Sequence, residues 1–297
     1  MPSVYTNFSF QQSMEKVISF GRMIKFSHTV FALPFALSAV ILAGKNYKLE
    51  MWDILWIIMA MVGARSSAMG FNRIVDASID AKNPRTANRE IPSGKISLVQ
   101  SIMFVICFTA LYIFSTVMLG KICFIFSIPV LFLLFFYSYT KRFTRFSHIY
   151  LGFAISLAPL GAWIAVTQSF HWSITILSLA LLTHIAGFDI MYSCQDYIFD
   201  RQEGLFSIPS QYGIIKALKI SRLLHGISFI CFVLIFFLFG LGKIYLVATM
   251  IIGLLLFIEH QIVDSENLSH IPIAFFHINC AVSIVLFAGI FGDVFLL

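Results

Sequence analysis

Long apolar stretches recur along the 297-residue chain, and they constrain its fold more than any other feature. A helix that crosses a bilayer needs about 20 mostly apolar residues to span a hydrocarbon core about 30 Å thick. Such segments are predicted at 21–44, 52–72, 97–118, 121–138, 147–168, 171–193, 222–240, 243–260 and 271–294. Of all residues 59% are apolar and 11% are charged, unlike a soluble domain. The sequence predicts an all-α integral membrane protein, with about nine transmembrane helices in a single domain over residues 1–297.

Lysine and arginine are unevenly distributed between the two sides of this predicted bundle. Fifteen of the 20 lie in the amino-terminal segment or in loops after even-numbered spans, four lie in the opposite loops, and Arg65 lies inside a span. By the positive-inside rule the basic side faces the cytoplasm. This predicts an inner-membrane protein whose active site faces the cytoplasm. Basic loops also attract anionic lipid headgroups, so the net charge of +6 requires no nucleic-acid partner.

Two acidic motifs lie at the cytoplasmic ends of predicted even-numbered spans. In the first, Asn72, Asp76 and Asp80 recur at every fourth residue, so they lie on one face of a helix. The second motif contains Asp196 and Asp200, again four residues apart. One such motif alone is more often a solvated face at a helix end than a metal site. Two motifs in equivalent places, each followed by a loop with Arg, Pro and Gly, indicate a shared site.

The chemistry of clustered carboxylates indicates what such a site binds. Carboxylates gathered at a membrane edge repel one another and lose hydration, so they are costly unless a cation lies among them. Mg²⁺ prefers oxygen ligands and is often shared between one or two carboxylates and substrate phosphates. The flanking Arg and Lys residues suit the remaining phosphate oxygens. The two motifs therefore predict a magnesium and diphosphate site.

Several segments around these motifs resemble the UbiA superfamily of intramembrane prenyltransferases. They are NPRTANREIPSGKIS after the first motif, YSYTKR after the fourth predicted span, and DYIFD in the second motif. The resemblance extends from the first span to about residue 213. It implies a helical bundle around a central cavity, with a cytoplasmic cap of loops and short helices over two Asp-rich loops, 72–96 and 194–213. It also implies Mg²⁺-dependent transfer of an isoprenyl chain from its diphosphate to an acceptor.

The resemblance assigns roles to individual residues of this chain. The implied catalytic and metal-binding set is Asn72, Asp76, Asp80, Asp196 and Asp200. The implied diphosphate-binding set is Arg65, Arg89, Tyr137, Lys141, Arg142 and Arg201. The chain departs from the family pattern at two places. Arg73 stands where many relatives have an aspartate directly after the motif asparagine. A lysine that some relatives carry after the second motif is absent, which leaves Arg201 and Lys216 as the nearest cations.

Two further segments narrow the expected acceptor. IKFSHTVFALPFAL and QDYIFDRQEGLFSIPSQYG resemble the branch that prenylates an aromatic acid in quinone biosynthesis. The acceptor is then 4-hydroxybenzoate, for ubiquinone, or 1,4-dihydroxy-6-naphthoate, for menaquinone. Arg22 and Lys25 are candidates to bind its carboxylate, although positive-inside anchoring explains them equally well. The predicted reaction transfers a polyprenyl group from polyprenyl diphosphate to an aromatic carboxylic acid, within membrane lipid.

An ion-coupled membrane transporter is the alternative class. Such carriers place charged residues near the bilayer midplane, between two halves of a bundle. Asp189 and Arg65 are the deepest charges and would serve that function. The other charges gather at one mouth of the bundle, which favours the enzyme. His184, His225 and His277 share no spacing, so they are left out of the predicted site.

Overall fold

A computed structural model describes residues 16, 18–25, 29, 31–265 and 268–296, and the regular secondary structure within these ranges is entirely helical. Eight helices or helical runs in these ranges are long and apolar enough to cross a membrane. They are α3 (Met51–Val75), α5 (Leu98–Met118), α6 (Lys121–Thr140), α7 (Ser147–Thr167), a run Trp172–Gln202 that begins with α8 (Trp172–Ser193), α11 (Ile214–Leu238), α12 (Lys243–Ile262), and a run Ile271–Leu296 that ends with α14 (Asn279–Leu296). The predicted all-helical membrane fold is confirmed.

The first predicted span, 21–44, differs from the other eight. Its described helix α2 (Leu33–Ala43) has only 11 residues, too few to cross a bilayer alone. Pro34 stands in the first turn of α2, where its fixed φ and missing N–H suit a helix start. Residues 26–28 and 30 of the predicted span lie outside the described residues. The count of nine spans therefore stays a prediction.

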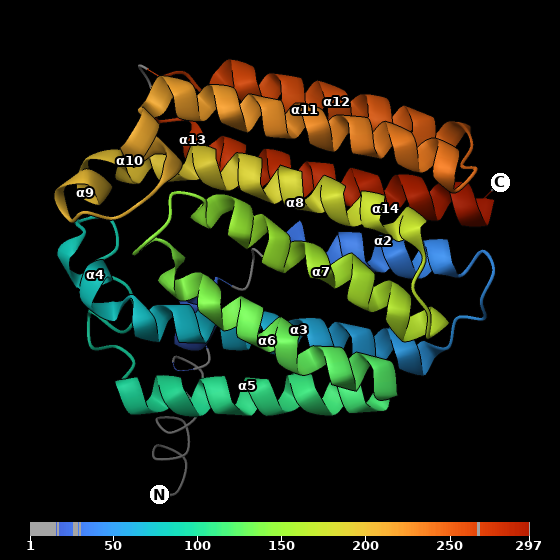
Figure 1. Ribbon diagram of the computed structural model, residues 1–297, viewed down its shortest axis with the longest axis horizontal. Coiled ribbons are helices and arrows are strands. Elements are labelled where there is room, and N and C mark those ends of the chain that lie inside the picture. The colour runs from blue at the N-terminus through green and yellow to red at the C-terminus, as the bar shows by residue number, and fades with distance from the viewer. Residues whose placement is uncertain (1–15, 17, 26–28, 30, 266–267, 297) are drawn as a thin grey trace, which may run out of the picture.

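Helix α8 lies at the centre of the bundle. In the 18-residue apolar stretch of the run that begins with α8, 72% of the residues are buried. In the corresponding stretch of α6 the share is 11%, so α8 is a core helix and α6 an outer one. Figure 1 shows α8 between α7 and α11, and α2 beside α7 and α14. The residues Phe35, Leu177 and Ile185 are wholly buried where α2 packs near α8. Side chains of the core helices therefore position whatever the centre of the bundle binds.

Helices α3 and α5 approach each other closely at Gly63. A Cβ at this position would lie 2.7 Å from the backbone nitrogen of Tyr112, which is closer than real Cβ contacts. Glycine is therefore required for the backbones to come together here. The close contact sets the distance between α3 and α5 at this point, and α3 leads directly into the first acidic motif.

Short helices and loops gather at one end of the bundle, at the left of Figure 1. They include α4 (Ala77–Lys82), α9 (Tyr197–Gln202) and α10 (Ile208–Tyr212). A capping box begins α10: Ser207 Oγ accepts from the Ser210 N–H, and Ser210 Oγ accepts from the Ser207 N–H. The two acidic motifs lie at this end.

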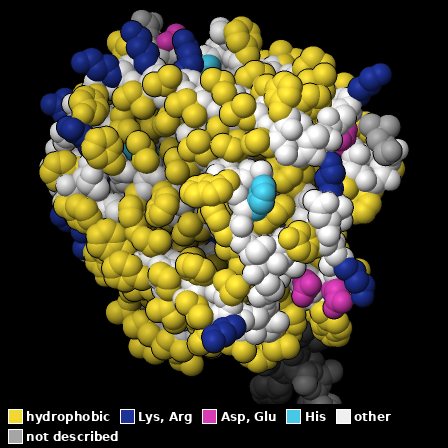
Figure 2. All heavy atoms as spheres, turned by 45° about the vertical axis from the view of Figure 1, so that its right-hand side comes forward, with side chains coloured by type: hydrophobic (Ala, Val, Ile, Leu, Met, Phe, Trp, Pro, Cys, Tyr) yellow, Lys and Arg dark blue, Asp and Glu magenta, His cyan; other side chains and the backbone are white. Residues whose placement is uncertain are grey.

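The outer surface is largely apolar. Figure 2 shows a face covered mostly by hydrophobic side chains, with Lys and Arg toward its rim. Phe132 and Phe237, for example, are 65% and 70% exposed. Apolar exposure on this scale is unusual for a soluble monomer and suits contact with lipid tails.

Candidate active site

A central cavity of about 420 Å³ lies among α3, α6, α7 and α8. Its wall contains both acidic motifs at one end and apolar residues such as Ile57, Leu119 and Ile164 at the other. Asp76 and Ile57 are 19 residues apart along α3, which corresponds to about 28 Å of helix. The cavity thus joins a strongly charged end to a long apolar wall, a combination that suits an amphipathic ligand.

The first acidic motif lies where α3 ends and α4 begins. Asp76 leaves helical geometry, with φ −92° and ψ 3°, and separates the two helices. The backbone N–H of Asp76 still donates to the Asn72 carbonyl, and that of Asp80 to the Asp76 carbonyl. All three motif side chains still line the central cavity. Asn72 Nδ2 also donates to Asp76 Oδ2 at 2.8 Å, which orients that carboxylate.

The second acidic motif repeats this backbone arrangement. Asp196 ends a short 3-10 helix, η2 (Cys194–Asp196), with φ −97° and ψ 7°, and α9 follows. Asp200 lies within α9, as Asp80 lies within α4, and all of these helices are six residues or shorter. Asp80, Asp196 and Asp200 are each less than 8% exposed. Both motifs therefore bring buried carboxylates to the same cavity through the same local structure.

Arginines of the first loop neutralise one aspartate of each motif. Arg85 forms an ion pair with both oxygens of Asp196, with Nε to Oδ1 at 2.8 Å, and Asn83 Nδ2 donates to the same Oδ1 at 3.0 Å. Arg89 Nη1 lies 2.6 and 2.7 Å from the two oxygens of Asp80. The loop after the first motif thus extends across the site to the second motif.

The other two aspartates have oxygens that remain available. Burial, and then the negative charge of Asp80, raises the pKa of Asp76 above its ordinary value. Arg142 Nη2 lies 3.6 Å from Asp76 Oδ1. Asp200 Oδ2 is buried without a hydrogen-bond partner among the described residues, and Lys141 Nζ lies 3.9 Å from it. A buried, underpaired carboxylate oxygen and a carboxylate with a raised pKa both suit a hard divalent cation.

Lys141 supplies positive charge between the two motifs. Burial lowers the pKa of Lys141, but the carboxylates of Asp200, Asp196, Asp189 and Asp76 outweigh it, so the net shift is upward. The side chain is therefore cationic at neutral pH. Its backbone carbonyl accepts from the Phe206 N–H at 2.8 Å, which joins the end of α6 to the second loop.

Most of the remaining predicted residues also line the central cavity. They are Arg65, Arg89, Tyr137, Lys141, Arg142 and Lys25. An adjoining cavity of about 340 Å³ is lined by Arg22, and it shares Lys25 and Arg89 with the central one. Arg201 lies apart from both cavities, where its Nη1 donates to the Tyr197 hydroxyl at 2.9 Å. The structure therefore brings together the predicted set except for Arg201.

The sequence did not point to Arg85 and Tyr192, which line the central cavity, or to His148, which contacts the cavity residue Asp189. Arg85 belongs to the quoted segment NPRTANREIPSGKIS, but nothing in its spacing distinguished it from its neighbours. His148 Nδ1 lies 2.6 Å from Asp189 Oδ2, so the deep carboxylate is paired inside the bundle. Tyr192 accepts from Arg85 Nη1 at 2.8 Å. The partners of Arg85 and His148 lie more than 40 residues away in the sequence, so no local sequence pattern could predict these contacts.

Arg73, the residue that departs from the family pattern, is buried and turned toward the amino-terminal segment. Its Nε donates to the Met23 carbonyl at 3.1 Å. Arg65 acts similarly, because its Nη2 donates to the Lys25 carbonyl at 3.2 Å. Both arginines therefore hold the amino-terminal segment against α3 while they line the central cavity.

The fold and the site together define a helical membrane protein with an acidic, arginine-lined site over an apolar cavity. Residues 32–281 match the UbiA prenyltransferase family, and the chain belongs to that family. A UbiA homologue from Aeropyrum pernix K1 has a similar structure, with 31% identity, a TM-score of 0.82, and coverage of 90% of this chain and 98% of that one. The predicted resemblance is confirmed, and family membership favours the enzyme over the ion-coupled transporter.

Two further relatives extend the comparison. A 4-hydroxybenzoate octaprenyltransferase from Saccharophagus degradans is 26% identical over 243 residues, 82% of this chain and 81% of the relative. A UbiA homologue from Archaeoglobus fulgidus, solved with GPP and Mg²⁺ bound, is 20% identical with a TM-score of 0.73 over 93% of this chain and 99% of that one. At 20% identity, the similarity to the Archaeoglobus fulgidus structure shows a shared fold and no more.

Proposed function

We propose that this single-domain chain transfers a polyprenyl group from polyprenyl diphosphate to an aromatic carboxylic acid. The observation that carries the proposal is the central cavity, because a charged end with two acidic motifs continues into a long apolar wall. A prenyl diphosphate has the same division into an anionic head and an apolar tail. Two relatives support the proposal, since one is a 4-hydroxybenzoate octaprenyltransferase and another was solved with GPP and Mg²⁺.

The proposed metal ligands are the motif residues Asn72, Asp76, Asp80, Asp196 and Asp200. Bound Mg²⁺ would supply positive charge that stabilises the departing diphosphate. Asp76 and Asp200 offer the most available oxygens. Asp80 and Asp196 are already paired with arginines, so a cation bound to them would share or replace these contacts.

The cationic side chains around the cavity have a complementary role. Arg85, Arg89 and Lys141 place fixed positive charge near the proposed diphosphate, where negative charge develops as the bond to the prenyl carbon breaks. The allylic carbon is then attacked by an electron-rich carbon of the acceptor ring, which afterwards loses a proton. When the bond to diphosphate breaks, the prenyl chain is left as an allylic cation. Water would capture this cation, so it must be kept out of the site. We assign its exclusion to the loops 72–96 and 194–213, which Lys82 and Glu203 join through a 2.7 Å ion pair.

The adjoining cavity is the proposed place for the acceptor's carboxylate. Five cationic residues line it, against a single acidic one, Glu90. The five are Arg22, Lys25, Arg73, Arg85 and Arg89. This excess of positive charge suits an aromatic acid, either 4-hydroxybenzoate or 1,4-dihydroxy-6-naphthoate, beside the diphosphate site. Product would then enter ubiquinone or menaquinone biosynthesis.

The test is prenyl transfer in membranes that contain the chain. Radiolabelled prenyl diphosphate and each candidate acid are incubated with Mg²⁺ or with EDTA, and labelled lipid product is measured. We expect product with one of the acids, loss of product in EDTA, and a fall of at least about 10²-fold in the Asp76→Asn and Asp196→Asn variants. Asp264→Asn is the matched control, because Asp264 is exposed and lies outside both cavities. Unchanged product in EDTA would refute the proposal.

A further inference from the structure

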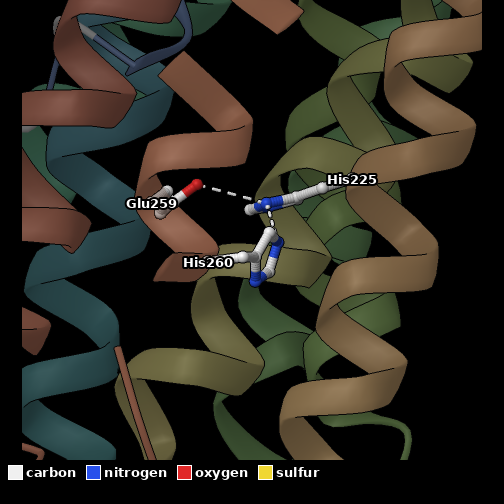
Figure 3. A group of neighbouring side chains, drawn as sticks. All are labelled: His225, Glu259 and His260. Atoms are coloured by element: carbon white, nitrogen blue, oxygen red, sulfur yellow. Dashed lines mark hydrogen bonds and ion pairs between the residues drawn. The ribbon is translucent and has the colours of Figure 1, made fainter. Parts of the chain in front are cut away.

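A second group of potential metal ligands lies outside the central cavity, on α11 and α12. His225 comes from α11, and Glu259 and His260 come from the last turn of α12. One ligand atom from each residue lies within 4.8 Å of the other two, and Figure 3 shows the side chains of Glu259 and His260 meeting that of His225. None of the three lines the central cavity, so the proposed prenyl transfer does not use them.

The hydrogen bonds of His225 determine which of its ring nitrogens is free. His225 Nε2 lies 3.1 Å from the backbone carbonyl oxygen of His184. A carbonyl oxygen accepts only, so Nε2 carries the hydrogen and donates it. In the neutral ring Nδ1 then presents a lone pair, and it faces Glu259 Oε2 at 3.2 Å and His260 Nε2 at 3.0 Å. A metal-binding histidine typically donates its other N–H to a carbonyl or carboxylate in this way.

Glu259 is an unusual residue for this environment, because its side chain is wholly buried. Asn279 Nδ2 donates to Glu259 Oε1 at 3.0 Å and orients the carboxylate. The other oxygen, Oε2, has no hydrogen-bond partner among the described residues and is the atom near His225. A buried carboxylate is costly without a countercharge, and a cation among the three ligand atoms would supply one.

We propose that His225, Glu259 and His260 bind a divalent transition-metal ion of the Zn²⁺ class. Two imidazole nitrogens and one carboxylate are a common zinc ligand set. Bonds of about 2.05 Å at tetrahedral angles separate neighbouring ligand atoms by about 3.3 Å, close to the 3.0 and 3.2 Å observed here. The ion would tie α11 to α12, and through Asn279 to α14. His260 is partly exposed, which gives the ion a route from outside the bundle.

Metal retention by the purified full-length chain tests this site. The chain in detergent is treated with chelator, incubated with Zn²⁺ in excess Mg²⁺, desalted, and its zinc measured by mass spectrometry. Excess Mg²⁺ competes for the all-oxygen motifs of the central cavity, which suit that ion. We expect about one more equivalent of zinc in the wild type than in His225→Gln or His260→Gln. His277→Gln is the matched control, because His277 is exposed and lies outside the ligand group.

A second measurement needs no substitution at a buried position. The thermal unfolding midpoint of the wild type should rise when Zn²⁺ is added to Mg²⁺-saturated protein, and the partly exposed His260→Gln variant should lose the rise. The Asp76→Asn variant should keep it. The proposal would be overturned if all variants retained the same amount of zinc and the unfolding midpoint of the wild type did not shift. The contacts among the three side chains would then be explained by a shared proton. Zinc lost only from Asp76→Asn would assign the metal to the central cavity and overturn it too.

Discussion

Arg85 belongs to the loop after the first acidic motif, yet its guanidinium binds the aspartate of the second. The contact joins residues 111 positions apart and pairs both oxygens of Asp196. Burial lowers the pKa of Arg85, but hydrogen bonding and charge from Asp196 outweigh it and raise the pKa. Arg85 is therefore a fixed cation at neutral pH, in the place where Arg201 was expected from the sequence.

The two arginines give a direct comparison of catalytic roles. We expect Arg85→Gln to lower the rate of prenyl transfer about 10²-fold, because a charge that stabilises the departing diphosphate is lost. Arg201→Gln should leave the rate close to that of the wild type, since Arg201 is exposed and contacts Tyr197 outside both cavities. Initial rates in membranes with matched expression measure both. A loss in Arg201→Gln equal to that in Arg85→Gln would contradict the assignment.

The sequence allowed the acidic residues to be predicted more completely than their cationic partners. Asn72, Asp76 and Asp80 line one cavity because a spacing of four residues is a local property of helices. The partner of Asp196 depends instead on which helix ends meet in space. Residue spacing does not predict which helix ends meet. The carboxylates could therefore be predicted from the sequence, but Arg85 and His148 could not.

At the level of secondary structure, both motifs interrupt the helices that were expected to run through them. Asp76 and Asp196 have nearly the same backbone angles, close to φ −95° and ψ 5°, and each precedes a six-residue helix. Such angles lie in the sparsely populated bridge region where many active-site residues occur. Aspartate is compatible with helix continuation too, so its presence alone did not reveal the break. The break brings two carboxylates per motif to the cavity, and of these only Asp76 is not fully buried.

The contact between α3 and α5 yields a prediction of stability. Gly63→Ala should destabilise the chain by about 1–3 kcal/mol, because the new methyl group forces apart backbones that nearly touch. The thermal unfolding midpoint in detergent measures the change. Gly226→Ala is the matched control, since a Cβ at Gly226 in α11 meets no atom within 4 Å. An undiminished midpoint in Gly63→Ala would show that α3 and α5 can separate without cost.

For the molecule as a whole, apolar length was a sufficient guide to the core architecture. Eight of the predicted spans correspond to helices or helical runs long enough to cross a membrane. The boundaries were less accurate: α11 begins at Ile214 and not at 222, and its first turns carry exposed Lys216 and Lys219. Long charged side chains let a helix continue beyond the bilayer edge. A search for apolar stretches therefore places such a helix start too late.

The orientation of the bundle is a prediction that cysteine labelling can check. In a cysteine-free background, Ser93→Cys and Asn46→Cys introduce exposed thiols in two different loops. The basic loop that contains Ser93 should face the cytoplasm. A membrane-impermeant maleimide should therefore label Asn46→Cys in intact spheroplasts and label Ser93→Cys only after lysis. Labelling of Ser93→Cys before lysis would reverse the proposed orientation.

The pair between Arg85 and Asp196 also sets an order of events during biosynthesis. At about 5–20 residues per second, the ribosome adds Asp196 about 6–22 seconds after Arg85. Throughout that interval the first loop exists without the acidic partner that later fixes it. The charged end of the cavity is therefore completed late, after α8 has been made, so a nascent chain stopped before residue 196 would hold its first motif in an unfinished site.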